Sequence, residues 1–292
     1  MPSSGVSGRV IQGDNLPVLR SLERESVDLI YIDPPFNTGH DQKRVQITTA
    51  RDPNGDRTGF GGRRYATTRI GKRAFADTFD DYLAFLEPRL VEAHRVLKPD
   101  GSFYFHIDYR EAHYCKVLLD GIFGRASFLN EIVWAYDYGA RTTKKWPAKH
   151  DTIFFYAKDP ERYVFNTDDI DRIPYMAPGL VGPEKAARGK LPTDTWWHTI
   201  VSPTGNEKVG YPTQKPLGIL SRIVRASSPA GGLVLDFFAG SGTTGAAALS
   251  CGRRFVLVDS SADAIDVMRR RFENDDVAFD AFAPEIEAPA SP

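Results

Sequence analysis

The chain has few cysteines and histidines, almost no net charge and no long apolar run. Cys115 and Cys251 are the only cysteines in 292 residues, which excludes a disulfide-stapled scaffold and predicts a reducing, cytoplasmic location. Six scattered histidines show no metal-ligand spacing, so we expect no metal site. No segment resembles a membrane span or a signal peptide, so we expect no membrane partner.

The net charge of −1 does not indicate a polyanionic partner, but the distribution of charge does. Residues 40–75 hold nine lysines and arginines, including Arg63 and Arg64, against three acidic residues. Residues 134–150 interleave aromatic side chains with Arg141, Lys144 and Lys145. Because a local basic face is enough to bind phosphates, both segments are candidate DNA-binding surfaces.

Apolar runs and helical spacings alternate at both ends of the chain and predict an α/β fold. We expect strands at 27–33, 102–107, 131–136, 152–156, 233–236 and 255–259, with helices near 83–97, 109–123, 216–224, 243–251 and 261–272. This alternation predicts a doubly wound, mostly parallel, Rossmann-like sheet. Residues 38–75 show no period and predict an irregular loop, and Ser260 with Asp263 predicts a capping box for the last helix.

A glycine loop follows the expected strand at 233–236. It reads Gly240-Ser241-Gly242-Thr243-Thr244-Gly245, and Asp259 ends the next strand. Glycines allow a tight turn and close approach of a ligand to the backbone, and the following helix presents its amide groups. The loop predicts a site for a nucleoside-bearing cofactor, in which Asp259 accepts hydrogen bonds from ribose hydroxyls. A nicotinamide-dependent oxidoreductase is disfavoured because only 47 residues (292 − 245) follow Gly245.

A second loop, Asp33-Pro34-Pro35-Phe36, ends the expected strand at 27–33. A carboxylate and proline carbonyls offer acceptors to an aromatic amine, and Phe36 offers a flat face for an extruded base. If the two loops open at the carboxyl edge of one sheet, they predict methyl transfer from S-adenosylmethionine to an amino group on a base.

With these motifs, the chain resembles the β-class amino methyltransferases of bacterial DNA, in which the catalytic motif precedes the cofactor motif. The resemblance covers about residues 9–275. It rests on Gln12-Gly13-Asp14, on Asp33 through Gly39, on Leu97 through Ser102, on Asn130 through Trp134, on His150 through Ile153, on Tyr211 through Pro216 and on Asp236 through Thr244.

The resemblance implies a role for individual residues. Asp33 and Phe36 would hold the target base, while Thr213 and Lys215 would hold the amino-acid end of the cofactor. Asp14 would lie near the cofactor adenine and Asp259 would bind the ribose. The remaining expected cofactor contacts are Asp33 and the residues of the glycine loop: Asp236, Phe238, Gly240, Ser241, Gly242, Thr243 and Thr244.

The resemblance also implies an activity and a division of the chain. Asp33 at the head of the catalytic motif favours adenine N6 in double-stranded DNA, reached by base flipping, over cytosine N4. A DNA-binding module without catalysis is disfavoured, and a homodimer and a partner restriction nuclease stay open. We expect a catalytic half at 9–129, an inserted target-recognition region at 130–205, a cofactor half at 206–275 and an acidic tail at 276–292.

Overall fold

A computed structural model of the chain describes residues 6–36, 42–51, 57–58, 64–75, 81–139, 141–202, 205 and 207–283, with the backbone alone for those between 42 and 75. The chain divides into two compact units, Pro35–Tyr82 and the remainder. Among the described residues, no helix has the length and apolar content needed to cross a membrane.

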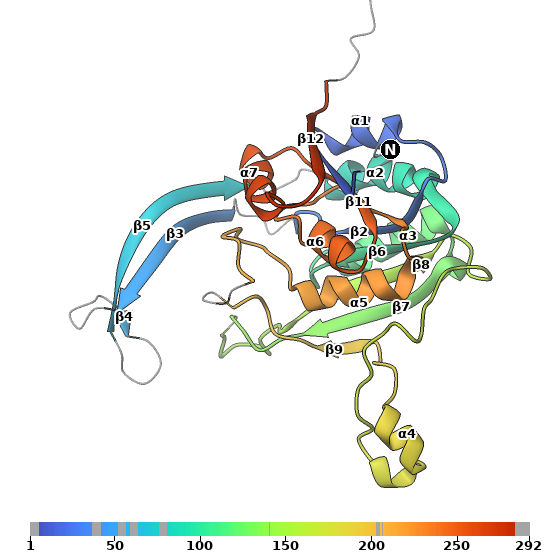
Figure 1. The fold of residues 1–292 in the computed structure, drawn as a ribbon. Helices are drawn as coiled ribbons and strands as arrows, with labels where there is room; N and C mark the ends of the chain where they lie inside the picture. Colours follow the sequence, from blue (N-terminus) through green and yellow to red (C-terminus); the bar gives the residue numbers. More distant parts are fainter. Residues whose placement is uncertain are drawn as a thin grey trace, which may run out of the picture. The chain divides into compact units, whose positions relative to one another are not determined.

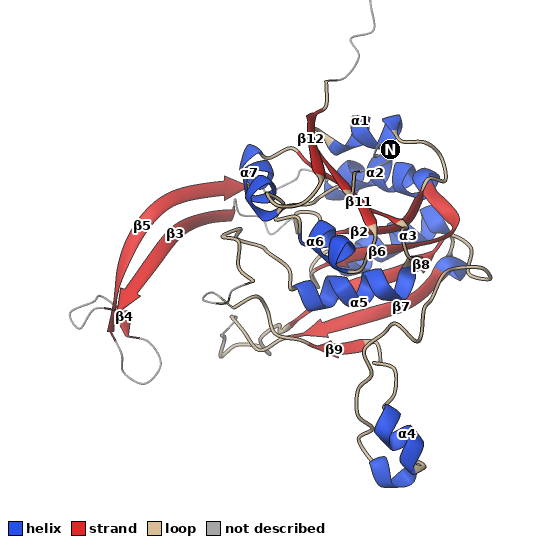
Figure 2. Ribbon diagram, viewed as in Figure 1, coloured by secondary structure: helices blue, strands red, loops and turns tan. Residues whose placement is uncertain are grey.

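The larger unit is a nine-stranded mixed sheet in the order β12-β1-β11-β10-β2-β6-β8-β7-β9 (Figures 1 and 2). Its strands are β1 (Gly8–Gln12), β2 (Val27–Ile32), β6 (Leu97–Ile107), β7 (Phe128–Ala135), β8 (His150–Ala157), β9 (Thr195–Trp197), β10 (Leu233–Asp236), β11 (Arg254–Asp259) and β12 (Val277–Ala281). From β12 to β6 all neighbours are parallel. β8 runs antiparallel to both β6 and β7, and β9 is parallel to β7.

Helices cover both faces of this sheet, as expected for a doubly wound fold. α1 (Asn15–Ser21), α2 (Tyr82–Val96) and α3 (Ala112–Phe123) lie on one face, while α5 (Leu217–Ser227), α6 (Thr243–Ser250) and α7 (Ala262–Arg271) lie on the other (Figure 2). Short 3-10 turns occupy Arg125–Ser127 and Pro178–Leu180. The central strand β2 is buried along its whole length, which matches the continuous apolar run predicted at 27–33.

The smaller unit corrects one prediction. Residues 38–75 were expected to be an irregular loop, but β3 (Gln42–Arg51), β4 (Arg57–Thr58) and β5 (Arg64–Phe75) form an antiparallel sheet in the order β3-β5-β4. β3 and β5 pair over their lengths with one register shift between Gln46 and Ile47. Arg64 pairs through its backbone with Thr58, whereas Arg63 lies outside the described residues.

Two of the expected regions contain strands of the main sheet, and one helix cap differs from its prediction; the division of the chain into these regions stays a prediction. The predicted recognition region at 130–205 contains β7 and β8, which belong to the main sheet. Residues 277–281 of the expected acidic tail form strand β12 beside β1. The cap of α7 is Ser261 and not Ser260, because the Ser261 hydroxyl accepts a hydrogen bond from the Ala264 amide at 3.4 Å.

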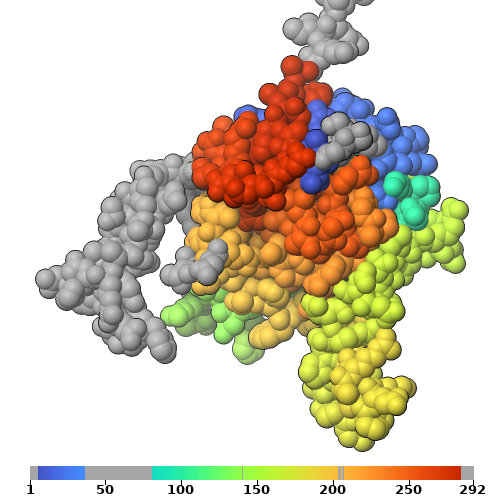
Figure 3. Space-filling view, viewed as in Figure 1, coloured from blue at the N-terminus to red at the C-terminus, as the bar shows by residue number. Residues whose placement is uncertain are grey.

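The topology brings the functional loops to one edge of the sheet. The parallel strands β1, β11, β10, β2 and β6 all end there, each at or beside an aspartate: Asp14, Asp259, Asp236, Asp33 and Asp108. Because β8 runs antiparallel to β7, the loop 136–149 that joins them lies at the same edge. β9 is parallel to β7, so residues 198–216, which follow β9, also begin at this edge. In contrast, residues 158–194, which include α4 (Pro183–Arg188), leave and re-enter the sheet at the opposite edge. In the space-filling view, this yellow-green segment projects from its neighbours (Figure 3).

Candidate active site

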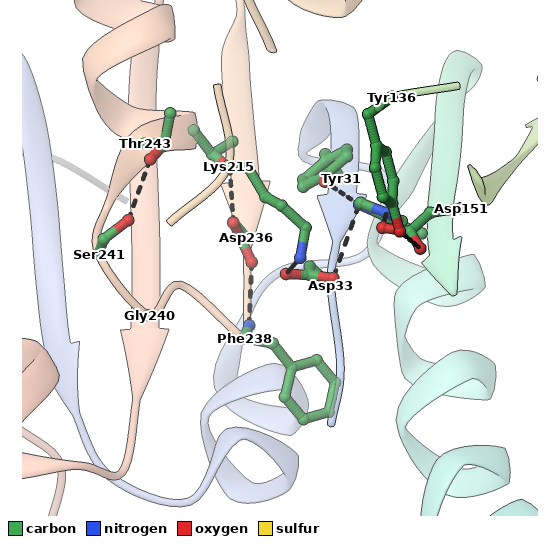
Figure 4. Close-up of polar contacts among 12 residues, drawn as sticks. Tyr31, Asp33, Tyr136, Asp151, Lys215, Asp236, Phe238, Gly240, Ser241 and Thr243 are labelled. Carbon is green, nitrogen blue, oxygen red and sulfur yellow. Dashed lines mark hydrogen bonds and ion pairs between the residues drawn. The ribbon is translucent and has the colours of Figure 1, made fainter. Parts of the chain in front are cut away.

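The glycine loop is folded back by the carboxylate of Asp236 at the end of β10. Asp236 accepts hydrogen bonds from the Thr244 hydroxyl at 2.6 Å and from the Phe238 amide at 3.0 Å (Figure 4). Burial raises the pKa of this carboxyl to about 7, even though both hydrogen bonds lower it. Asp236 therefore fixes the conformation of the loop through these two hydrogen bonds. Its contact with a cofactor stays a prediction.

Two glycines of the loop adopt left-handed backbone conformations. Gly240 has a φ of 49° and Gly242 a φ of 73°. A Cβ atom at Gly240 would lie 3.1 Å from the Tyr211 ring, and one at Gly242 would lie 2.8 Å from the Met268 side chain. Both positions thus require glycine for conformation and for space.

Asp259 braces the same loop from the neighbouring strand β11. One carboxylate oxygen accepts a hydrogen bond from the Gly240 amide at 2.8 Å, and the other accepts one from the Ser261 amide at 2.9 Å. Burial raises the pKa of the Asp259 carboxyl against these two hydrogen bonds. Each oxygen keeps a lone pair, so the predicted ribose contact is compatible with this bracing role.

The remaining predicted cofactor residues lie along the same edge. Asp14 caps α1, is exposed, and forms an ion pair with Arg89 at 3.1 Å. The hydroxyls of Ser241 and Thr243 lie 3.0 Å apart in the buried part of the loop, and Thr213 is exposed.

Arg89 connects α2 to the loop through Asn15. Its Nε atom donates a hydrogen bond to the Asn15 side chain at 2.6 Å, and Asn15 donates one to the Phe237 carbonyl at 2.7 Å. The guanidinium also stacks on Phe85, which lies 6.1 Å from the Phe238 ring. Sequence reasoning missed this connection, since neither Asn15 nor Arg89 belongs to a recognisable motif.

Asp33 emerges from β2, the neighbour of β10, and its two carboxylate oxygens have different environments. Lys215 forms an ion pair and hydrogen bond with Oδ2 (Figure 4). Oδ1 is buried and accepts no hydrogen bond from the described part of the chain. A buried acceptor without a hydrogen bond costs free energy. Asp33 Oδ1 is therefore suited to accept a hydrogen bond from an N–H group of a substrate.

A buried hydrogen-bond chain lies behind Asp33, and it too was missed. The His106 ring is fully buried, with Nδ1 2.7 Å from the Tyr31 hydroxyl and Nε2 3.2 Å from Asp151. The Tyr136 hydroxyl donates to the second oxygen of Asp151 at 3.0 Å. His106 Nδ1 is also 3.6 Å from Asp33 Oδ1. A histidine inside the apolar run 102–107 was the available signal for this chain.

The Pro-Pro-Phe part of the catalytic motif lies at the boundary between the two units of the chain. Pro34 follows Asp33 in the larger unit, while Pro35 and Phe36 belong to the smaller one. Within the smaller unit, the Tyr82 hydroxyl donates a hydrogen bond to the Pro35 carbonyl at 2.6 Å. Phe36 is half-buried, and its predicted stacking on a base stays a prediction.

The basic and aromatic loop 136–149 is exposed at the edge that carries Asp33. Arg141, Lys144 and Lys145 are all exposed, and Lys145 lies 5.9 Å from the centre of the Tyr109 ring. Trp146 is 94% exposed, unlike the buried Trp134. An open cavity of about 520 Å³ is lined by Arg141 with Asp137, Tyr138, Gly139 and Lys149. The loop thus exposes cations and an aromatic ring at its surface.

The chain as a whole has relatives among known proteins. The family model described as DNA methylase matches residues 27–270. The chain belongs to this DNA methylase family. It is 30% identical over 273 residues to the type II methyltransferase M.HpaI of Haemophilus parainfluenzae, covering 94% of this chain and 76% of that protein. It is 31% identical over 277 residues to the DNA adenine methyltransferase YhdJ of Escherichia coli strain K12, covering 90% and 82%.

Solved structures share the fold of this DNA methylase. The cytosine-N4-specific PvuII DNA methyltransferase matches with a TM-score of 0.62 at 17% identity, covering 91% of this chain and 86% of that one. TTHA0409 of Thermus thermophilus, complexed with S-adenosyl-L-methionine, matches with a TM-score of 0.60 at 19% identity, covering 94% and 99%. The predicted family and the mostly parallel Rossmann-like fold are therefore confirmed.

Proposed function

We propose that this protein is a DNA methyltransferase that transfers a methyl group from S-adenosylmethionine to adenine N6 in double-stranded DNA. One observation carries the proposal: the buried Oδ1 of Asp33 lacks a donor among the described residues and lies on the strand next to the glycine loop. An exocyclic amine has the N–H groups that such an acceptor needs.

The residues of the glycine loop fit S-adenosylmethionine. The left-handed turn at Gly240 and Gly242 leaves backbone without side chains on the cofactor's approach, and α6 begins directly after it. Gly240, Phe238 and Asp259 would hold the nucleoside, with Asp14 near the adenine ring. Thr213 and Lys215 would hold the amino-acid end. When bound, this cofactor supplies an activated methyl group as a sulfonium.

The chain's own residues supply orientation and polarisation. Asp33 would accept a hydrogen bond from the target amine and so draw electron density toward its nitrogen. Lys215 fixes the Asp33 carboxylate by holding its other oxygen. Because the target base must leave the duplex to reach Asp33, we infer base flipping, with Phe36 as a stacking surface.

Adenine is the better-supported target. Asp33 heads the catalytic motif as in adenine-specific members, and the relative YhdJ is named a DNA adenine methyltransferase. The experiment is nucleoside mass spectrometry of duplex DNA after incubation with the protein and isotopically labelled S-adenosylmethionine. We expect labelled N6-methyladenine. Labelled N4-methylcytosine alone would refute the target, and an absence of label in any base would refute the activity.

A further inference from the structure

We propose that Trp146 stacks inside the DNA duplex, in the gap that the flipped target base leaves behind. This inference rests on the proposed function and names one DNA contact within it. Trp146 is 94% exposed and makes no hydrogen bond or ring contact with the described part of the chain. In contrast, the indoles of Trp134 and Trp196 are buried and donate hydrogen bonds to carbonyl groups. The indole of Trp146 therefore adds nothing to the core and is open to a partner.

The residue before Trp146 ties the indole to the edge of the sheet that carries Asp33. Lys145 Nζ lies 5.9 Å from the centre of the Tyr109 ring, within the range of a cation–π contact. Tyr109 follows β6, and β6 pairs with β2, the strand that leads to Asp33. Because neighbouring strands are only about 4.8 Å apart, Tyr109 and Asp33 follow adjacent strands at one edge. Trp146 thus lies at the edge where we propose that the target base is held.

The ends of the loop 136–149 provide a second tie to the same site. The Tyr136 hydroxyl donates a hydrogen bond at 3.0 Å to Asp151, which belongs to the buried hydrogen-bond chain behind Asp33. The Tyr136 amide donates to the Lys149 carbonyl at 2.9 Å and so closes the loop. Trp146 lies three residues before Lys149, and three residues span at most about 11 Å. The indole is therefore held close to the strands that carry the proposed active site.

Contacts within the loop order it before DNA binds. Lys149 Nζ donates a hydrogen bond to the Gly139 carbonyl at 3.0 Å and forms an ion pair with Asp137 at 3.4 Å. Pro147 directly follows Trp146, and a proline favours an extended backbone at the residue before it. An ordered loop loses less conformational entropy on binding than a flexible one. The loop can therefore hold the indole in place against the tendency of the flipped base to return.

The residues around Trp146 match the chemistry of DNA. The nine residues 141–149 contain four cations and no acidic residue: Arg141, Lys144, Lys145 and Lys149. The cations suit phosphates, whereas an indole offers a flat face on which any base can stack. When a base leaves the duplex, its neighbours lose a stacking partner, and an inserted ring restores part of that stacking. Trp146 would therefore favour the flipped state of the target without reading the sequence.

The first experiment locates the indole in the complex with DNA. The methylated sequence is mapped by sequencing DNA treated with the unaltered protein, and a duplex of that sequence is made with 5-iodouracil in place of the thymine opposite the target adenine. Under ultraviolet light, 5-iodouracil forms a crosslink to an aromatic ring stacked on it. We expect the crosslinked peptide to contain Trp146. A crosslink only to Trp197, which is 77% exposed at the end of β9, or to no tryptophan would overturn the proposal.

The second experiment compares single-turnover methylation of a paired and a mispaired target base. Trp146→Ala should lower the rate on the paired target by about 10- to 100-fold, the loss that corresponds to one base–aromatic stack, with unchanged cofactor affinity. A mispaired base leaves the duplex at a lower cost, so on the mispaired target the rate of this variant should return to within about threefold of the parent. Trp146→Phe keeps a stacking ring and should retain most of the parental rate on both duplexes.

The controls separate this inference from a structural role and from the proposed function. Met176→Ala removes an apolar side chain that is 97% exposed on the segment from the opposite edge of the sheet, and it should behave as the parent. A Trp146→Ala variant with the parental rate, or with equal losses on both duplexes, would overturn the stacking role while methylation by the parent stands. If the unaltered protein methylates no DNA, the proposed function fails and this inference fails with it.

Discussion

The ammonium group of Lys215 contacts a carboxylate oxygen of Asp33, although 182 positions separate the two residues in the sequence. Lys215 precedes α5 and Asp33 follows β2, so the contact links the two halves of the chain at the carboxyl edge of the sheet. The resemblance assigned Lys215 to the amino-acid end of the cofactor. The structure adds that Lys215 orients the proposed catalytic carboxylate.

Asp33→Ala should abolish methyl transfer while largely sparing cofactor binding. The variant loses the acceptor for the target amine but keeps Gly240, Gly242 and Asp259. A loss of at least about 10²-fold in turnover is expected for removal of one such group. Turnover is measured with labelled cofactor and affinity by calorimetry, and turnover within tenfold of the parent would contradict the role.

Lys215→Met and Asp33→Asn should be coupled in stability. Each single change removes a largely buried ion pair and leaves the charge of the other partner uncompensated by this contact, so both should destabilise the fold. The double variant should lose less than the sum of the two, with a coupling free energy of about 0.5–3 kcal/mol. Urea denaturation of the four proteins measures this cycle, and strict additivity would rule out the pair as a stabilising contact.

Gly240→Ala should weaken cofactor binding, whereas Gly231→Ala should not. Both glycines have a positive φ, so each variant should lose about 1–2 kcal/mol of folding stability. Only at Gly240 would the added methyl group also meet another side chain, Tyr211; nothing lies within 4 Å at Gly231. Calorimetric titration with S-adenosylmethionine separates the two effects, and equal affinities would exclude a backbone contact at Gly240.

Asp236 should make the fold less stable as the pH rises toward neutrality. Its carboxyl titrates near 3.8 when exposed and at about 7 when folded, so between these values the native state holds a proton that the unfolded state has lost. The free energy of unfolding relative to Asp236→Asn should therefore fall by about 1.4 kcal/mol per pH unit inside this window. Denaturation at pH 5, 6 and 7 checks the slope; a difference that is flat, or rises with pH, would contradict it.

Lys144→Ala combined with Lys145→Ala should weaken DNA binding on all sequences alike. If both cations contact phosphates, the slope of log affinity against log salt should become shallower by about 1.8. Lys185→Ala with Arg188→Ala is the matched control, because α4 lies on a segment from the opposite edge of the sheet. A changed preference for sequence with an unchanged slope would mean that the lysines read bases.

The strands and the two loops of the proposed active site could be predicted because the residues that form each of them are adjacent in the sequence. The strand expected at 233–236 is β10, and the glycine and aspartate loops lie on neighbouring strands as inferred. The smaller sheet was not predicted, because β3 and β5 stabilise each other through cross-strand pairing and alternation in their sequences is confined to the short run from Arg44 to Thr48. The pattern of residues within one strand does not indicate which other strand it pairs with.

The buried chain of Tyr31, His106 and Asp151 was out of reach for a similar reason. Its members come from β2, β6 and β8 and meet only after the sheet has formed. Sequence reasoning treated the histidines only as metal ligands, and so passed over a single buried ring with two hydrogen-bonding partners. The shift of the α7 cap from Ser260 to Ser261 is within the usual uncertainty of a helix boundary.

The antiparallel direction of β8 has a consequence for how specificity can change. The loop 136–149 leaves β7 and returns to β8 beside a closing hydrogen bond from the Tyr136 amide to the Lys149 carbonyl at 2.9 Å. Residues between these two can be lengthened, shortened or replaced without altering the register of either strand. A lineage could therefore exchange the surface that we propose for DNA binding while it inherits the chemistry proposed for Asp33 unchanged.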